Sequence, residues 1–231
     1  DAEGLAFELA AISVALAVLD FSAERLREAV DSATVAEAAI LRADATDVTS
    51  LSTAGLIKGA ALMLQKPWRE ARIRDAQAQF RKVTRLYPLQ KDIESFAPGL
   101  AQALAWDFAA TSLLQSLGKR IDGNGHGKMP AVFERAANPD ERCGRIDWAS
   151  RAEPVYPADA RREGYVGAVM IGFHIGDDLR VEDARLLSEV PANRFGEAVL
   201  EAAAEWQVAS MENEPRGCRR NRITRVRFVI D

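Results

Sequence analysis

The residues that could do chemistry in this chain are few and widely spaced. The sequence contains two cysteines, Cys143 and Cys218, and two histidines, His126 and His174. None of them has the spacing of a structural zinc site, so we expect no bound metal. Both cysteines lie in polar, turn-rich stretches, and paired loop cysteines suit an oxidising compartment. We therefore expect a disulfide between Cys143 and Cys218, with free surface thiols as the alternative.

The carboxylates and histidines offer little for catalysis. Asp177 and Asp178 follow Gly176 in a predicted tight turn, where solvated acids are far commoner than a catalytic pair whose pKa values are separated by burial. No serine, cysteine or histidine belongs to a nucleophile motif, and His174 falls on the less apolar side of a predicted strand. We expect neither enzyme activity nor a cofactor.

The composition indicates a folded chain with one large or two ordinary domains. Of its 231 residues, 48% are hydrophobic and 28% charged, which excludes a disordered or collagen-like chain and a polytopic membrane protein. The net charge is −4. Six arginines gather between Arg216 and Arg227, but no aromatic stacking platform is interleaved with them. Nucleic acid is therefore not an expected partner.

The first half of the chain predicts helices, because apolar residues recur with a period near 3.6. We expect five, over about 5–19, 22–43, 52–65, 67–88 and 98–118. Ser22 is the expected N-cap of the second helix, and Pro67 is expected at the first position of the fourth. Gly55 and Gly59 would allow a close helix approach. The first helix carries one apolar stripe, and it is too short for a bilayer span, so we expect it to be buried. The stripe consists of Leu5, Leu9, Ile12, Leu16 and Leu19.

The arrangement of these helices has two interpretations. Ala76, Phe80, Val83 and Pro88 match the offsets of the second helix of a tetratricopeptide repeat, but no second copy follows at a 34-residue period. An ordinary helical bundle is favoured, and a tetratricopeptide-like one is the alternative. The predicted domains are a helical domain over 1–120, a glycine- and proline-containing linker over 121–150 and a second domain over 151–231.

In the second domain the hydrophobic period changes to two. Alternation within 165–175 predicts a strand with Val169, Ile171 and Phe173 on one face, followed by a turn at 176–178 and a second strand to about 188. An amphipathic helix over 195–206 and a strand over 223–230 complete the pattern. The predicted fold class is α+β, with a three-stranded antiparallel sheet packed on two helices.

Residues 153–230 resemble the carboxy-terminal domain of TonB, the energy transducer of Gram-negative bacteria. The shared features occur in order: a Tyr-Pro pair before a short helix, a Glu-Gly pair before the first strand, a Gly-Asp turn, a Pro-Ala-Asn end to the second strand, a tryptophan closing the helix and an alternating last strand. Here they are Tyr156-Pro157, Glu163-Gly164, Gly176-Asp177, Pro191-Ala192-Asn193, Trp206, Val226, Phe228 and Ile230. None of these features is specific to the family alone, but their occurrence together and in this order is.

The resemblance implies a periplasmic domain that binds outer-membrane receptors and transmits force derived from the inner-membrane proton gradient. The implied partners are an extended receptor segment, which in the family adds beside the last strand, and an inner-membrane proton-channel complex. An open edge strand offers unpaired backbone N–H and C=O groups for such binding. Its arginines would either recognise the partner or prevent self-association. The expected partner-binding residues are Tyr156, Pro157, Arg222, Ile223, Thr224, Arg225, Val226, Arg227 and Phe228.

The chain also departs from the family's pattern. Glu153, Pro154 and Val155 precede Tyr156, where the family carries glutamines. A helical domain stands in place of the family's membrane anchor and proline-rich spacer. Two alternatives stay open: a transducer whose anchor preceded Asp1, or a soluble periplasmic scaffold that binds proteins through helical repeats and forms a strand-exchanged homodimer.

Overall fold

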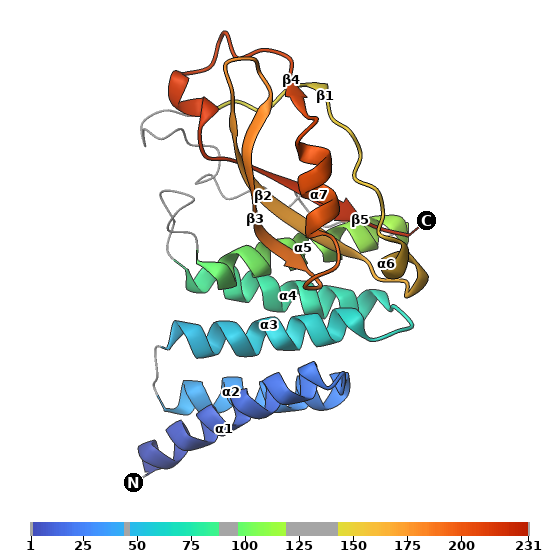
Figure 1. Cartoon of the computed structure of the whole chain (residues 1–231). Helices are drawn as coiled ribbons and strands as arrows, with labels where there is room; N and C mark the ends of the chain where they lie inside the picture. The colour runs from blue at the N-terminus through green and yellow to red at the C-terminus, as the bar shows by residue number, and fades with distance from the viewer. Residues whose placement is uncertain (1, 44–46, 88–96, 119–142, 231) are drawn as a thin grey trace. The chain divides into compact units, whose positions relative to one another are not determined.

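The computed structural model describes residues 2–43, 47–87, 97–118 and 143–230 (Figure 1). The chain divides into two compact units, Asp1–Pro88 and Leu89–Asp231. The first unit is helical, and the second combines helices with two small sheets. The predicted α+β class, with a helical part followed by a three-stranded antiparallel sheet, is confirmed.

Four helices form the described part of the first unit. They are α1 (Ala2–Ser22), α2 (Leu26–Arg42), α3 (Val48–Leu64) and α4 (Glu70–Leu86), and each packs against the next. A Cβ atom at Gly55 would lie 2.6 Å from Cγ2 of Val83, and one at Gly59 would collide with the ring of Phe80. The two glycines therefore let α3 and α4 approach closely, as expected.

Two helix starts differ from the sequence prediction. Ser22 is the last residue of α1, and Arg25 precedes α2 without a side-chain cap. The turn is instead closed by Arg25, whose guanidinium donates to the Asp20 carboxylate at 2.6 Å while its backbone N–H donates to the Asp20 carbonyl. Pro67 lies in the connection ahead of α4, which begins at Glu70.

The expectation that α1 is buried is wrong for its leucine stripe. The side that packs on α2 carries the small residues Ala10, Ser13 and Ala17, which let the two helices approach. Because α1 is apolar on nearly every side between Leu9 and Leu19, its periodicity could not tell which side meets the core. The stripe is exposed: Leu5 by 67%, Leu9 by 45%, Ile12 by 58%, Leu16 by 47% and Leu19 by 60%.

The second unit is built around an antiparallel sheet with the strand order β3-β2-β5. The strands are β2 (Gly167–Ile175), β3 (Val181–Val190) and β5 (Arg222–Phe228). A smaller sheet pairs β1 (Trp148–Ser150) with β4 (Gln207–Val208). The remaining elements are α6 (Ala158–Arg162), α7 (Gly196–Ala203) and the 3-10 helix η2 (Arg216–Arg219).

Both faces of the three-stranded sheet are covered. Val169, Ile171 and Phe173 point into a core that includes Val199 of α7 and Trp206. The other face is covered by α5 (Pro98–Ser116), which packs against all three strands and leaves Met170 fully buried. The sequence-based division placed α5 in the first domain, whereas the compact units place it with the sheet. The predicted linker 121–150 lies mostly outside the described residues.

The start of α7 is fixed by one carboxylate at the end of β3. Glu189 accepts backbone N–H groups of Asn193, Arg194, Phe195 and Gly196 at 2.7–3.1 Å. Partial burial raises the pKa of Glu189, but these N–H groups outweigh burial and bring it below the ordinary 4.5. The ionised carboxylate therefore stabilises the start of α7.

Replacing Glu189 with alanine should cost about 1–2 kcal/mol of unfolding free energy at neutral pH. Because the folded-state pKa is lowered, this stabilisation is fully present above pH 4.5 and is lost as the pH falls through the folded pKa. The difference in unfolding free energy between wild type and variant, measured by urea unfolding, should become smaller as the pH is lowered. Glu201→Ala, on the exposed side of α7, is the control. A difference in unfolding free energy that does not change with pH would contradict the stabilising role of the ionised Glu189 carboxylate.

Candidate functional site

The outer side of β5 is the candidate binding edge. β5 pairs with β2 in one uninterrupted register, from Gly167 opposite Phe228 to Phe173 opposite Arg222. No described strand pairs with β5 on its other side. A regular edge of this kind presents alternate N–H and C=O groups at the spacing that an extended peptide needs.

The opposite edge of the same sheet is less suited to pairing. The register of β3 against β2 is interrupted twice, between Met170 and Ile171 and between Gly172 and His174. Asp183 in β3 has a positive φ of 49°. Bulges of this kind twist a strand and break the run of outward groups, so they protect an edge from further strands. Of the two edges, β5 is the more competent for strand addition.

Arg151 already contacts the β5 edge. Its Nη2 donates to the Arg225 carbonyl at 3.2 Å and lies 3.4 Å from Oγ1 of Thr224. The guanidinium also lies over the rings of Trp148 and Trp206, at 5.3 and 4.8 Å from the ring centroids. Burial lowers the pKa of Arg151. The contact indicates that the Arg225 carbonyl points away from β2.

Two of the predicted edge arginines are engaged by α5. The guanidinium of Arg225 lies 4.4 Å from the ring centroid of Phe108, and Arg227 donates to Oε1 of Gln115 at 2.9 Å. Burial lowers the pKa of Arg225, and the nearby charge of Asp107 opposes that shift. These side chains extend over the face of the sheet rather than along its edge.

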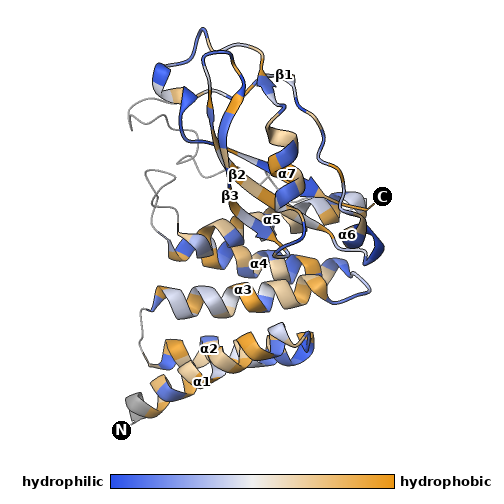
Figure 2. Cartoon of the chain, viewed as in Figure 1, coloured by the Kyte–Doolittle hydropathy of each residue, from blue (hydrophilic) through white to orange (hydrophobic). Residues whose placement is uncertain are grey.

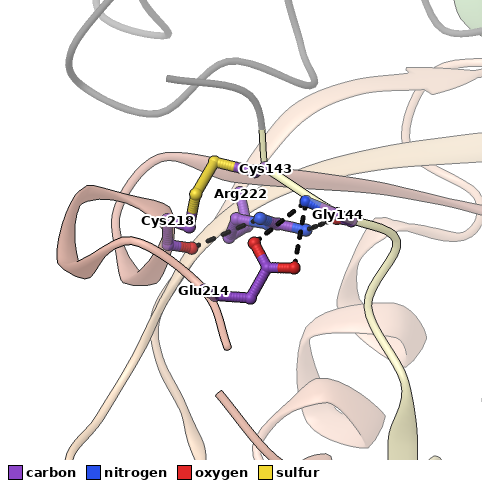
Figure 3. Close-up of a disulfide and its surroundings, with 5 residues drawn as sticks. All are labelled: Cys143, Gly144, Glu214, Cys218 and Arg222. Carbon is purple, nitrogen blue, oxygen red and sulfur yellow. Dashed lines mark hydrogen bonds between the residues drawn. A yellow bond between two sulfur atoms is a disulfide. The ribbon is translucent and has the colours of Figure 1, made fainter. Parts of the chain in front are cut away.

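Arg222 is buried in a clamp around Gly144 (Figure 3). Its Nη2 donates to the Gly144 carbonyl at 2.7 Å, and the Glu214 carboxylate accepts the Gly144 N–H at 2.9 Å. Burial lowers the pKa of Arg222, while Glu214 opposes that shift. The clamp makes Arg222 an anchor for the start of β5.

The predicted disulfide between Cys143 and Cys218 is confirmed, and it closes the same clamp (Figure 3). The Cα atoms lie 5.4 Å apart, within the usual range for a disulfide. Glu214 lies close to both sulfurs, but disulfide sulfurs are not the thiolates that metals bind. The bond holds the segment leading to β1 against the chain that enters β5.

Tyr156 and Phe228 are joined by an aromatic cluster. Phe228 stacks on Phe195 with 4.3 Å between ring centroids, and Tyr156 meets both rings edge-on. The Tyr156 hydroxyl donates to the Tyr165 carbonyl. Burial raises the pKa of Tyr156, and Arg161 opposes that shift. The cluster fixes the segment before α6 to the end of β5.

The remaining residues that were predicted to bind the partner differ in their solvent exposure. Ile223 is buried, whereas Thr224 and Val226 are partly exposed. Pro157 precedes α6 and lines a surface hollow of about 610 Å³ with Glu189 and Arg194.

His174 and the turn acids show structural contacts. Nδ1 of His174 accepts the Asn221 N–H at 3.1 Å, which fixes the chain just before β5. Oδ1 of Asp178 accepts the Arg180 N–H at 3.0 Å within the β2–β3 turn. His126 lies outside the described residues.

Sequence analysis missed the role of Arg151 and the placement of α5. Arg151 is the first residue of the predicted second domain, directly after the predicted linker, and its contacts span 73 and 74 residues. A tryptophan three residues earlier, at Trp148, was the one local sign of packing there. A helix that covers the second face of the sheet could have been predicted from Ala168 and Met170, because both are apolar residues on that face.

Comparisons with known proteins agree on the second unit. The family model described as Gram-negative bacterial TonB protein C-terminal matches residues 152–230. Protein TonB of Pseudomonas aeruginosa is 39% identical over 54 residues, and Protein TonB of Klebsiella pneumoniae is 36% identical over 58 residues. These alignments cover 23% and 25% of this chain, but only 16% and 24% of the two relatives.

A solved structure gives a similar match. The solution NMR structure of the Pseudomonas aeruginosa TonB CTD is 31% identical, with 37% of this chain and 87% of that chain covered and a TM-score of 0.31.

Among the described residues, the second unit thus contains a small α+β domain with one regular edge strand, β5, whose outer side no other described strand occupies. Residues 152–230 are a TonB C-terminal domain.

Proposed function

We propose that this chain is the periplasmic docking part of a TonB-like energy transducer, and that it binds an extended segment of an outer-membrane receptor on the outer side of β5. The observation that supports this most is the uninterrupted β2–β5 ladder beside an outer side that no described strand occupies. Binding of this kind requires no catalytic group, and affinity comes from main-chain hydrogen bonds. The proposed activity is therefore non-enzymatic.

The periplasmic location is supported by the disulfide. Cys143 is 7% exposed and Cys218 is fully buried, so the bond is part of the folded core. Such bonds persist in oxidising compartments, including the bacterial periplasm. Coupling to an inner-membrane proton-channel complex belongs to the same proposal, since force transmission needs a connection to that membrane.

A scaffold role is the second candidate function. In this version the helices of the first unit, with α3 packed closely on α4, bind another protein of the cell envelope. In this version the second unit pairs its β5 edge with that of another copy. A concentration-independent dimer with β5 already paired would favour this candidate.

The docking proposal is tested by removing one outward N–H. Arg227 belongs to the same alternate set as Arg225, whose carbonyl contacts Arg151 outside the sheet. Arg227→Pro removes the side chain and the N–H, whereas Arg227→Ala removes the side chain alone and serves as the control. Binding is measured by calorimetry with a panel of synthetic peptides from the periplasm-facing segments of outer-membrane receptors.

At least one peptide should bind wild type and Arg227→Ala with similar affinity and should lose at least tenfold in affinity for Arg227→Pro. If no peptide binds the folded protein, the docking proposal fails. Equal binding to all three proteins would place the site away from β5.

The contact of Arg151 predicts a second effect on the same site. We expect an added strand to donate an N–H to the Arg225 carbonyl, where it would compete with the hydrogen bond that Arg151 already donates. Arg151→Met keeps much of the apolar stem on Trp148 and Trp206 but removes this donor. Because one hydrogen bond contributes about 0.5–1.5 kcal/mol, peptide affinity should rise by roughly 3- to 10-fold in calorimetry. Arg162→Ala, on exposed α6, should leave affinity unchanged; weaker binding to Arg151→Met would mean that Arg151 contacts the peptide.

A further inference from the structure

The Cys143–Cys218 disulfide lies where a pull on β5 would leave the second unit. Cys218 precedes Arg222, the first residue of β5, by four positions. Cys143 begins the described range 143–230, which follows α5 in the chain. The bond shortens the covalent route between the two cysteines from 75 residues to one side-chain bridge. A pull that passes along the chain from β5 toward α5 can therefore cross at the disulfide.

The backbone route between the two cysteines is long and contains weak elements. It runs through β1, α6, β2, β3, α7 and β4 before it reaches η2. β1 has three residues and α6 has five, so few hydrogen bonds hold either of them. Elements with so few bonds are the first to open when a chain is stretched. Without the disulfide, a pull along the chain would act on β1 and α6 before it reached the sheet.

The same backbone route carries the core on which β5 depends. β2 pairs with β5 and is coloured as hydrophobic over much of its length (Figure 2). Val169, Ile171 and Phe173 of β2 form one core with Trp206. If a pull unfolded this segment, β5 would lose its neighbour among the described strands. Docking on β5 therefore requires that the segment between the cysteines stays folded while β5 is under tension.

Hydrogen bonds reinforce the crossing at the disulfide (Figure 3). Arg222 is 7% exposed and donates to the carbonyls of Gly144, at 2.7 Å, and Cys218, at 3.4 Å. Glu214 accepts the Gly144 N–H at 2.9 Å. Hydrogen bonds that involve a charged group are stronger than those between neutral groups. The segment that starts at Cys143 and the chain that enters β5 are therefore held together by a covalent bond and by two charged side chains.

We propose that the Cys143–Cys218 disulfide transmits tension from a peptide docked on β5 to the chain on the α5 side, and so keeps the segment between the two cysteines folded under that tension. The inference rests on the proposed function, because a docked peptide is what would pull on β5 through main-chain hydrogen bonds. It gives the bond a mechanical task beyond its contribution to stability.

The test applies a constant force between the chain and its bound peptide with optical tweezers. One handle is attached to the full chain through a bioorthogonal amino acid at Leu117, which is 40% exposed and directly follows α5, so that the first unit carries no force. The other handle is attached to a receptor peptide that binds wild type in calorimetry. The experiment records any lengthening before the peptide is released, and it compares the lifetime of the complex with and without force.

Two variants separate force transmission from stability. Cys143→Ser combined with Cys218→Ser removes the bond. Trp206→Ala is the matched control, because it removes a fully buried side chain within the segment between the cysteines and leaves the disulfide intact. A cavity of that size should cost an amount of stability comparable to loss of the bond. Trp206→Phe takes its place if circular dichroism shows that Trp206→Ala is unfolded.

Wild type and the Trp206 variant should release the peptide without an unfolding step of the second unit. The disulfide-free variant should lengthen by up to about 250 Å before release, the length of 75 extended residues. Force should also shorten the lifetime of its complex at least tenfold more than it does for wild type.

Equal lifetimes under force for wild type and the disulfide-free variant would overturn the proposal. So would a Trp206 variant whose lifetime falls as far as that of the disulfide-free variant, because stability alone would then explain the effect. If no receptor peptide binds wild type in calorimetry, the proposed function fails and this inference fails with it. Normal binding combined with unchanged lifetimes would overturn this inference alone.

Discussion

Trp206→Ala should lower the unfolding free energy of the second unit by about 3–5 kcal/mol. Trp206 is fully buried, and its ring meets Trp148 edge-on at 5.3 Å between centroids. Its Nε1 donates to the Ala152 carbonyl at 2.8 Å, so the substitution leaves a cavity and an acceptor without its partner. It also removes one of the two rings beneath Arg151.

The measurement is urea unfolding followed by near-ultraviolet circular dichroism. Trp206→Phe keeps an aromatic ring but removes the N–H and some volume, and should cost about 1–2 kcal/mol. A loss near zero for Trp206→Ala would mean that Trp206 does not belong to the core that joins α7 to the sheet.

Removing the disulfide should have an effect of similar size. Cys143 and Cys218 are separated by 75 residues, and closing a loop of that length stabilises by on the order of 4 kcal/mol through the unfolded chain. Replacing both cysteines with serine should lower the unfolding free energy by that amount. It should also loosen the clamp that Glu214 and Arg222 form around Gly144.

The comparison is made by urea unfolding with and without dithiothreitol. Reductant should destabilise wild type nearly to the level of the double variant and should leave the double variant unchanged. If wild type lost no stability on full reduction, the bond would contribute little to the fold.

The sheet was predictable because its signals are local. Alternation in 165–175 assigned Val169, Ile171 and Phe173 to one face, and the structure places all three in the same core. The turn acids separated β2 from β3, and the helical period after Phe195 gave α7 to within a few residues. Each of these signals lies within one element or one turn.

The features missed by sequence analysis depend on contacts between residues far apart in the sequence, or on helices that are apolar on more than one side. α1 is apolar nearly all round, so its period gave a helix but assigned the leucine stripe to the wrong side. α5 has apolar residues throughout and could cover either a helix or a sheet. Arg151 reaches Arg225 across 74 residues, and a local pattern carries no information about such a contact.

The edge strand was therefore predicted, but the placement of its side chains was not. The last strand was expected to be an open edge, and β5 is one among the described strands. Its arginines were expected along that edge, whereas Arg222 is buried in the clamp and Arg225 and Arg227 contact α5. The recognition role of these side chains stays a prediction, and the backbone of β5 carries the proposed affinity.

Amide hydrogen exchange, resolved by NMR with and without saturating receptor peptide, tests the docking of a foreign strand on β5 most directly. Binding should slow exchange at the outward N–H groups of Ile223, Arg225 and Arg227 and leave the edge of β3 unchanged. Protection confined to β3, or bound peptide with no change along β5, would contradict the account.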